Sequence, residues 1–306
     1  MGSADVVIDS SGCSLAASYV EAAEPIAAAL LIVGSGRTDR NSDVRLPGGM
    51  KLRGAITRTL AEALGAVGVS SLRFDKRGIG ASGGDYLATG MDQRAADVRA
   101  VRDWLAAKTA GLPLVAIGHS EGTYYAAQLA ADAQAAGAVL LSGAARPGGD
   151  VLTYQVAEIG KRLPASARFI LRLMRTDVAR AQRKNQARIM ASTADVMRIQ
   201  GQRVNARWVR DFVAYDPASA LARITVPVLA ITGGHDLQVP PEDVEAMGRL
   251  VQGPFEGHVV PDLSHLLRPD PDSLGPRGYR RQTRQPVSPE VVRLVTDWVT
   301  THWARS

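Results

Sequence analysis

Short apolar runs alternate with longer segments in which apolar residues recur at helical spacing, and this pattern continues along most of the chain. The later runs are almost continuously apolar, as are strands covered on both faces of a parallel sheet. We predict eight strands, at residues 5–9, 13–19, 27–33, 69–75, 113–118, 138–142, 226–232 and about 258–260. We predict helices between them, at about residues 50–67, 91–109, 121–135, 241–251 and 289–303. This alternation predicts an α/β fold with a mostly parallel, eight-stranded sheet flanked by helices.

One interval between predicted strands is far longer than a connection in such a fold needs. It lies between residues 142 and 226 and contains many apolar residues at helical spacing. These residues are Leu152, Val156, Ile159, Leu163, Phe169, Ile170, Leu173, Met174, Val204, Trp208, Phe212 and Val213. We therefore predict a helical cap, or lid, at residues 146–215, inserted into a core domain formed by residues 1–145 and 216–306. A second stretch, residues 267–287, is rich in Pro, Gly and Arg without periodicity, and we predict a mobile surface loop there.

The composition is that of a compact protein. Of 306 residues, 46% are hydrophobic and 22% are charged, and no run reaches the roughly 18 apolar residues of a membrane span. The one cysteine, Cys13, cannot form an intramolecular disulfide. Residues 1–11 contain no basic segment that leads into an apolar run. We therefore expect a cytoplasmic location and no membrane partner.

The formal net charge of +6 is concentrated in the predicted cap. Residues 146–215 contain 14 basic and five acidic residues, a net charge of +9. This charge could favour an acidic substrate such as an acyl-CoA, but Arg residues on the solvent face of amphipathic helices explain it more simply. Because the basic residues form no nucleic-acid-binding motif, we expect no nucleic-acid partner.

One serine occupies the sequence context of an activated nucleophile. Residues 114–122 read LVAIGHSEG, an apolar strand that ends in G-x-S-x-G and precedes a helix. A sharp turn of this kind holds Ser120 in a strained conformation, and glycines at positions 118 and 122 avoid backbone collisions. The same pattern occurs around Ser82, but Gly-Gly-Asp follows that serine and cannot readily start a helix. We interpret Ser120 as the nucleophile and Ser82 as a loop residue.

A serine nucleophile needs a base, and the base needs an orienting carboxylate. Among five histidines we favour His265, which follows a predicted strand and would lie at the same sheet edge as Ser120. Asp236 follows a buried strand and a glycine turn, so it is the candidate acid, with Asp262 or Asp216 as weaker substitutes. The order Ser, Asp, His, with spacings of 116 and 29 residues, is that of the α/β-hydrolases.

Together these segments resemble the α/β-hydrolase superfamily, in particular its capped esterases and its serine-aminopeptidase-like branch. The resemblance rests on residues 74–84, which read FDKRGIGASGG, on the serine turn, and on residues 233–240 and 262–265. It implies an α/β-hydrolase fold and a structural role for Asp75 and Arg77. Residues 33–41 resemble the oxyanion loop of that family, with Val-Gly in place of its common His-Gly opening. The backbone N–H groups of Ser35 and Glu121 are then the candidate oxyanion donors.

The predicted activity is hydrolysis of a small-molecule acyl substrate by a Ser120–His265–Asp236 triad, without a cofactor or a metal ion. Carboxylic esters are the first choice of substrate. Thioesters and peptides or amides pass through the same intermediate and remain alternatives, as does a non-catalytic binding protein with this fold. Gly34, His119 and Trp208 are candidate substrate-binding residues. The sequence leaves the oligomeric state open.

Overall fold

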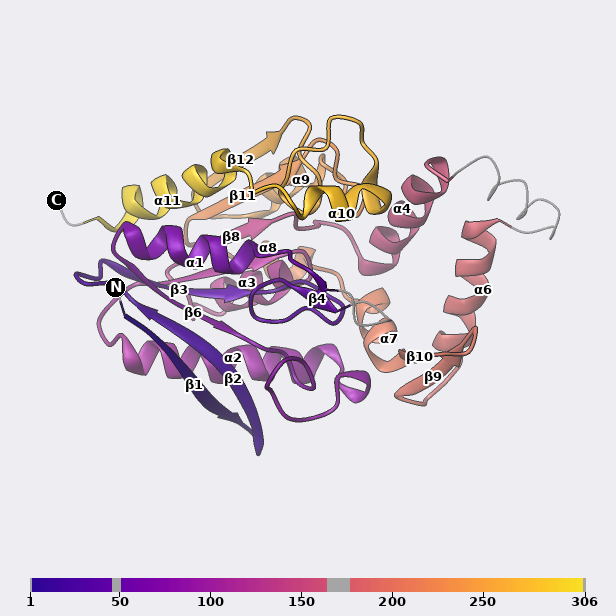
Figure 1. Cartoon of the computed structure of the whole chain (residues 1–306), viewed down its shortest axis with the longest axis horizontal. Coiled ribbons are helices and arrows are strands. Elements are labelled where there is room, and N and C mark those ends of the chain that lie inside the picture. The colour runs from indigo at the N-terminus through magenta and orange to yellow at the C-terminus, as the bar shows by residue number, and fades with distance from the viewer. Residues whose placement is uncertain (1, 46–50, 164–176, 305–306) are drawn as a thin grey trace.

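The computed structural model of the chain describes residues 2–45, 51–163 and 177–304. At its centre lies an eight-stranded sheet with the order β1–β2–β6–β3–β7–β8–β11–β12 (Figure 1). Strands β1 (Gly2–Ser10) and β2 (Cys13–Glu21) form an antiparallel hairpin, and β2 is also antiparallel to β6 (Val69–Phe74). All other neighbours are parallel, which confirms the predicted fold class. The remaining strands are β3 (Ala27–Ile32), β7 (Leu114–His119), β8 (Gly137–Leu141), β11 (Val228–Gly233) and β12 (Phe255–Val260).

Helices cover both faces of this sheet, and each face has its own hydrophobic core. Helices α1 (Ile56–Ala66) and α11 (Pro289–Trp303) cover one face. Helices α2 (Met91–Lys108), α3 (Gly122–Ala131) and α9 (Asp243–Leu250) cover the other. Helix α1 begins later than predicted. Ala55, just before it, has a φ of +52°, and residues 51–52 form strand β5, which pairs with β4 (Val44–Arg45). Met50, the predicted start, lies outside the described residues.

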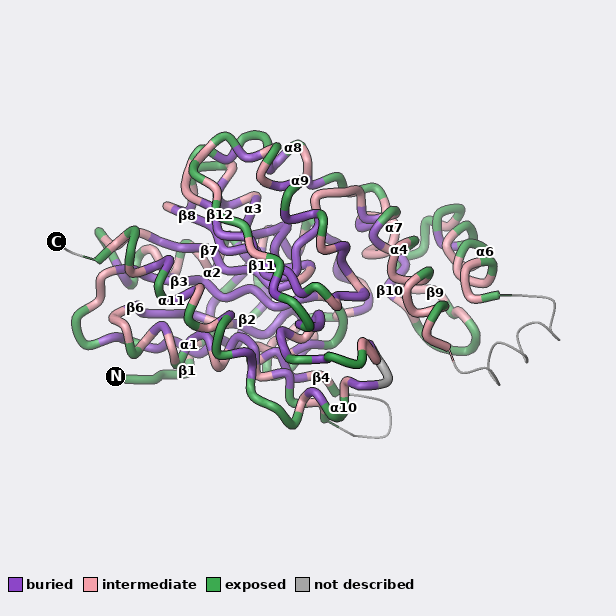
Figure 2. Tube along the Cα trace, turned by 90° about the horizontal axis from the view of Figure 1, so that it is seen from above, coloured by how far each residue is buried: buried purple, intermediate pink, exposed green. Residues whose placement is uncertain are grey.

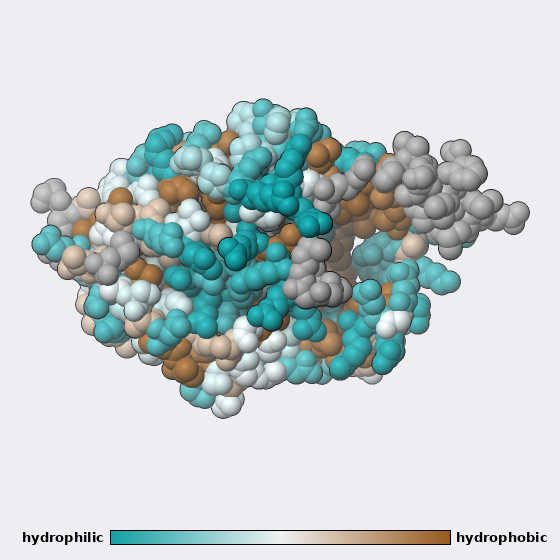
Figure 3. Space-filling view, viewed as in Figure 1, coloured by the Kyte–Doolittle hydropathy of each residue, from teal (hydrophilic) through white to brown (hydrophobic). Residues whose placement is uncertain are grey.

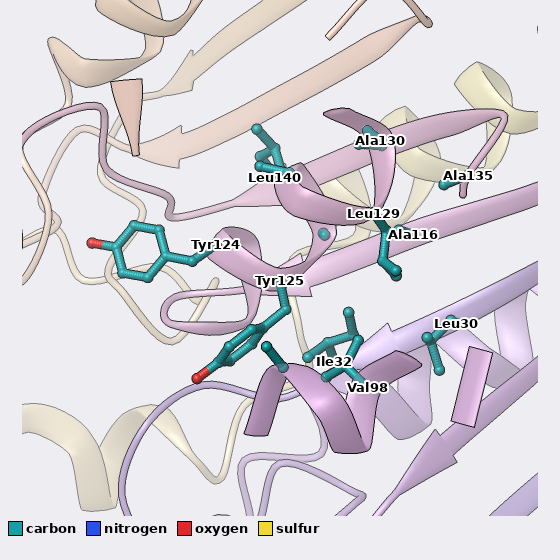
Figure 4. Packing of buried hydrophobic residues seen from close by; sticks show 14 of the residues in the cluster. Leu30, Ile32, Val98, Ala116, Tyr124, Tyr125, Leu129, Ala130, Ala135 and Leu140 are labelled. Carbon is teal, nitrogen blue, oxygen red and sulfur yellow. The ribbon is translucent and has the colours of Figure 1, made fainter. Parts of the chain in front are cut away.

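The turn around Ser120 leads into α3, and α3 packs in the core on the α2 face of the sheet. In Figure 4, Tyr125 and Leu129 of α3 point toward Leu30 and Ile32 of β3 and toward Val98 of α2. All five side chains are at most 4% exposed. Burying each large apolar side chain contributes about 1.5–3 kcal/mol to folding, so the start of α3 is rigidly held. The tube coloured by burial shows the same buried interior in the centre of the molecule (Figure 2).

The insertion between β8 and β11 differs in part from the predicted helical cap. It contains α4 (Gly148–Lys161), α6 (Val178–Met190) and α7 (Ala206–Ala214), followed by the short α8 (Ala218–Leu221). It also contains a hairpin of β9 (Val196–Ile199) and β10 (Gln202–Asn205), so Val204, predicted at helical spacing, lies in a strand. The turn between these strands is Gln200–Gly201, both with positive φ, which suits a two-residue hairpin. The predicted helical positions Phe169, Ile170, Leu173 and Met174 lie outside the described residues.

The stretch at residues 267–287 is not the surface loop that we predicted. It contains a 3₁₀ turn at Gly275–Gly278 and helix α10 (Tyr279–Gln282), and the side chains of Arg268, Asp270 and Gln282 are buried. Polar side chains are buried here through hydrogen bonds to distant backbone, and such contacts leave no hydrophobic period in the sequence.

In the described part of the chain, every helix is too short or too polar to cross a lipid bilayer.

Candidate functional site

Ser120 occupies a strained turn between β7 and α3, as the sequence predicts. Its φ is +55°, in the left-handed region that L residues rarely adopt. A Cβ atom on Gly118 would lie 2.3 Å from the carbonyl oxygen of Gly122, and one on Gly122 would lie 2.3 Å from that of Ile32. Only glycine therefore fits on either side of the serine, and the turn presents Ser120 at the carboxyl edge of the sheet.

Ser82, the second serine in a G-x-S-x-G pattern, has a structural role. Its Oγ donates a hydrogen bond to the carbonyl of Asp75 at 2.7 Å and accepts one from the amide of Ala16 at 2.9 Å. Nearby, Arg77 forms a buried ion pair with Asp97 at 2.8 Å. These contacts tie the loop after β6 to β2 and to α2, and they agree with the structural role implied for Asp75 and Arg77.

Asp236 and His265 lie side by side, although 29 residues separate them. The Nδ1 atom of His265 is 2.8 Å from Oδ2 of Asp236, and both side chains are at most 5% exposed. Asp236 also accepts hydrogen bonds from the amides of Gln238 and Val239. Burial alone would raise the pKa of this carboxyl, but His265 and the two amides reverse that effect and hold the pKa below its ordinary value. Asp236 is therefore a carboxylate that orients the imidazole through Nδ1.

The two weaker candidates for the acid lie elsewhere. The side chain of Asp262 is 63% exposed and lies 3.6 Å from His235. Asp216 accepts a hydrogen bond from the amide of Ala218, at the start of α8. The structure therefore favours Asp236.

Ser120 and His265 line one cavity of about 240 Å³ at the carboxyl edge of the sheet. Gly34 and Ser35, from the loop after β3, line the same cavity. No hydrogen bond joins Ser120 and His265 among the described residues, and such contacts often tighten only when substrate is bound. The structure thus places Ser120 and the imidazole of His265, which is hydrogen-bonded to Asp236, at one cavity, as the topology of parallel strands predicts.

His119 holds the histidine loop in place. Its Nε2–H donates a hydrogen bond of 2.9 Å to the backbone carbonyl of His265. Complete burial, and then the neighbouring His265, lower the pKa of His119 to about 3, so its ring is neutral. His119, which we predicted as a substrate-binding residue, also lines the cavity that Ser120 and His265 share. No pattern in the sequence indicates its hydrogen bond to the histidine loop.

The two candidate oxyanion donors flank the serine. The amides of Ser35 and Glu121 donate to no acceptor in the described part of the chain. Beside them, the Nζ atom of Lys76 donates hydrogen bonds to the carbonyls of Gly34 at 2.5 Å and Gly36 at 2.7 Å. Lys76, which the sequence analysis did not single out, therefore fixes the loop that contains Ser35.

The side chain of Glu121 forms a buried polar network. It pairs with Arg94 at 2.9 Å and accepts hydrogen bonds from Tyr125 Oη at 2.7 Å and Trp208 Nε1 at 2.9 Å. Burial raises the pKa of Glu121, but Arg94 and then Lys76 outweigh it, so the pKa lies below its ordinary value. Because Trp208 belongs to α7, this network joins the inserted segment to the serine turn.

A second cavity, of about 60 Å³, is also lined by Ser120. Trp208 and Glu121 line it, and Gln238 lines both cavities. Figure 3 shows a hollow with apolar residues at its back, between the core and the inserted elements. Arg94, Lys76 and Gln238 were not predicted, because each is defined by contacts distant in sequence. No group of three or more His, Cys, Asp or Glu within the described ranges could hold a metal ion.

A mostly parallel sheet with these connections, and a strained serine turn at its carboxyl edge, defines the α/β-hydrolase fold. Within that class, the chain belongs to the serine aminopeptidase S33 family (Hydrolase_4), whose model matches residues 44–272. None of the curated proteins is significantly similar to this chain.

Solved structures of hydrolases share the fold at low sequence identity. Est1E from Butyrivibrio proteoclasticus, bound to ferulic acid, has a TM-score of 0.64 and 18% identity, over 98% of this chain and 100% of its own. The α/β hydrolase GrgF from Penicillium sp. sh18 has a TM-score of 0.63 and 15% identity over the whole of both chains. The esterase PF2001 from Pyrococcus furiosus has a TM-score of 0.62 and 16% identity, over 99% of this chain and 91% of its own.

Proposed function

We propose that this α/β hydrolase is a serine esterase that cleaves carboxylic esters through an acyl-enzyme. Ser120 attacks the ester carbonyl while His265 takes its proton, and Asp236 orients His265 and stabilises the imidazolium. The amides of Ser35 and Glu121 bind the oxyanion. The observation that carries the proposal is the buried Asp236–His265 pair, at 2.8 Å, facing the cavity that contains the strained Ser120.

The reaction balances with water as the only co-reactant. A bond forms between Ser120 Oγ and the acyl carbon, the bond to the alcohol oxygen breaks, and His265 delivers the proton to that oxygen. Water, deprotonated by His265, then releases the carboxylic acid and restores Ser120. No step calls for a cofactor.

Two features support an ester rather than a coenzyme A thioester. Neither cavity has an Arg or Lys among its described lining residues, so neither offers a cation to a phosphate group. The cations of α6 are exposed to solvent; they are Arg180, Arg183, Lys184 and Arg188. PF2001 is described as an esterase, which points the same way. We propose that residues 146–215 act as a cap over a core formed by residues 1–145 and 216–306.

A substrate panel tests the proposal. We expect turnover of p-nitrophenyl esters, with less or none for acyl-CoA thioesters and aminoacyl amides, and loss of turnover in Ser120→Ala. Ser82→Ala is the matched control, because Ser82 lies in the other G-x-S-x-G pattern and is held by backbone contacts. A fluorophosphonate probe that failed to label folded wild-type protein at Ser120 would favour the non-catalytic binding protein instead.

A further inference from the structure

Two cavities of different size meet at Ser120. Both are lined by Ser35, Ser120 and Gln238. Beyond these, the larger, of about 240 Å³, is lined by aliphatic side chains and by the polar side chains of Thr38, Ser42, Tyr279 and Thr283. The smaller, of about 60 Å³, is lined by aromatic and aliphatic side chains of α3, α4 and α7. The aliphatic residues of the larger are Val44, Leu52, Ile56 and Leu266. The apolar residues of the smaller include Tyr124, Val151, Leu152, Trp208 and Phe212.

The position of His265 assigns a substrate group to each cavity. His265 lines the larger cavity and is not a lining residue of the smaller one. Since its Nδ1 is bound to Asp236, the proton for the leaving group must come from Nε2. The leaving oxygen must then lie within about 3 Å of Nε2, on the His265 side of the tetrahedral intermediate. The alcohol therefore extends into the larger cavity, and the acyl group extends away from His265 into the smaller one.

We propose that the preferred substrates join a short acyl group to a bulky apolar alcohol. This proposal rests on the esterase function above. An apolar protein cavity of about 150 Å³ holds benzene, which corresponds to roughly 25 Å³ for each heavy atom. On that scale the smaller cavity holds about two or three heavy atoms and the larger about ten. Acetyl and propionyl esters of a bicyclic alcohol fit these sizes.

Two isomeric esters provide the test, because they exchange the two groups without changing composition. In 2-naphthylmethyl acetate the bulky group is on the alcohol, and in methyl 2-naphthylacetate it is on the acyl side. Both have an alkyl alcohol as leaving group, and each rate is divided by the rate of alkaline hydrolysis of the same ester. We expect kcat/KM, which reports acylation, to favour the acetate by about tenfold or more. Equal values, or a preference for the methyl ester, would overturn the assignment.

A fluorophosphonate probe separates this proposal from the esterase function. Labelling at Ser120 without turnover of either isomer would overturn the substrate class alone. Absence of both labelling and turnover would overturn the esterase function as well.

Variants in the two cavities sharpen the test. Leu152→Ala enlarges only the smaller cavity, so we expect the hexanoate-to-acetate ratio of kcat/KM to rise about tenfold. Leu266→Ala enlarges only the larger cavity, so it should change the dependence on alcohol size and leave that acyl ratio unchanged. A rise of the acyl ratio in Leu266→Ala, without one in Leu152→Ala, would reverse the assignment of the cavities.

A separate observation concerns Lys76. Its Nζ donates a hydrogen bond to the carbonyl of Gly34, and that carbonyl belongs to the same peptide unit as the N–H of Ser35. In a trans peptide these two groups point in opposite directions. With the carbonyl held on the Lys76 side, the Ser35 N–H is directed away from Lys76.

We infer that Lys76 is a positioning residue for the oxyanion hole, acting through this peptide. Its amino group fixes the orientation of the Gly34–Ser35 peptide, and its protonated form also polarises the peptide, which makes the N–H a stronger donor. Arg94 and Glu121 are the charged groups that face Lys76, and the ring of Tyr86 lies 5.9 Å from its Nζ.

The test uses Lys76→Met, with Lys184→Met on the exposed side of α6 as the matched control. We expect Lys76→Met to lower kcat about 10- to 100-fold with KM within about twofold, and Lys184→Met to change neither. A trifluoromethyl ketone, which forms an oxyanion with the serine, should bind Lys76→Met more weakly by the same factor as kcat/KM. Unchanged ketone affinity would overturn the inference. Lys76→Gln, which keeps a donor without the charge, should be intermediate and provides the test if Lys76→Met does not fold.

Discussion

Glu121 and Arg94 form a buried ion pair immediately beside the nucleophile. Their closest atoms are 2.9 Å apart, and the side chains are 2% and 4% exposed. A carboxylate placed one residue after Ser120 would repel a developing oxyanion. Its charge is balanced here by Arg94, and its oxygens accept hydrogen bonds from Tyr125 and Trp208. The pair therefore serves the stability of the serine turn and the attachment of α7.

Neutralising Glu121 should destabilise the protein strongly. Glu121→Gln leaves the Arg94 charge buried without a counter-ion, so we expect a loss of about 3–5 kcal/mol in the free energy of unfolding by urea. Glu245→Gln is the control, because its pair with Arg249 is exposed on α9 and contributes at most about 1 kcal/mol. Similar unfolding curves for the two variants would contradict this interpretation.

The carboxylate of Glu121 should make the free energy of unfolding decrease as the pH falls into the acid range. The pKa of Glu121 is lower in the folded protein than its ordinary value of 4.5, so its contribution to stability is present above that value. This contribution is lost as the pH falls through the folded pKa. We expect the stability difference between wild type and Glu121→Gln to be largest above pH 4.5 and to shrink in acid. Urea unfolding of both proteins across this range measures it, and a difference independent of pH would argue against a charged Glu121.

Asp236 should be essential for turnover but not for folding. Asp236→Asn keeps the side-chain shape and can hold His265 only in the wrong tautomer, so we expect kcat to fall roughly 10³- to 10⁴-fold with KM little changed. Asp262→Asn, which alters an exposed carboxylate near His235, should retain most of the activity. If Asp262→Asn were the more impaired variant, the orienting acid would have to be reassigned.

The parts of the site that could be predicted from the sequence depend on local constraints. Apolar strands and glycines at positions 118 and 122 specify the turn around Ser120, because any Cβ there would collide with backbone. Parallel strands end at one edge, so the positions of Ser120, Asp236 and His265 after predicted strands were enough to predict that they lie at one edge of the sheet.

The remaining contacts could not be predicted, because they join positions that no periodic pattern connects. Arg94 meets Glu121 across 27 residues, and Arg268 reaches the carbonyl of Gly54 across 214 residues. Lys76 contacts the carbonyls of Gly34 and Gly36 across 42 and 40 residues. Short polar elements such as β9 and β10 also have too few residues for a pattern, so the cap was predicted as helical throughout.

Lys76 should make stability depend on pH in the alkaline range. Burial, and then the charge of Arg94, lower its pKa from 10.5 to about 7. Below pH 7 the folded protein carries a buried ammonium at its full cost. Between pH 7 and 10.5 the folded state loses the proton that the unfolded state keeps, so this cost diminishes as the pH rises.

Wild type should therefore gain stability relative to Lys76→Met between pH 7 and 10.5, by at most about 1.4 kcal/mol for each pH unit. Guanidinium unfolding at several pH values measures the difference. The exposed control Lys184→Met should show no such trend relative to wild type. A constant difference for Lys76→Met would mean that Lys76 titrates near its ordinary value.

Arg268 should anchor the histidine loop. It lies three residues after His265 with only 2% of its surface exposed, and its guanidinium donates to the carbonyls of Gly54, Leu266 and Gln285 at 2.6–2.9 Å. Arg268→Met would leave these carbonyls without this donor, and the loss at the buried carbonyl of Gly54 costs about 1–3 kcal/mol. We expect a lower urea midpoint and a lower kcat, because the loop that positions His265 loses its contact with the start of α1.

Two further variants separate the contribution of the planar guanidinium donors of Arg268 from that of its charge. Arg268→Lys keeps the charge, but a single ammonium cannot reach three carbonyls in different directions, so we expect only partial recovery of stability and kcat. Arg284→Met removes an exposed cation from the same segment and should leave both quantities near their wild-type values. Full recovery in Arg268→Lys would show that the charge, rather than the planar set of donors, holds the loop in place.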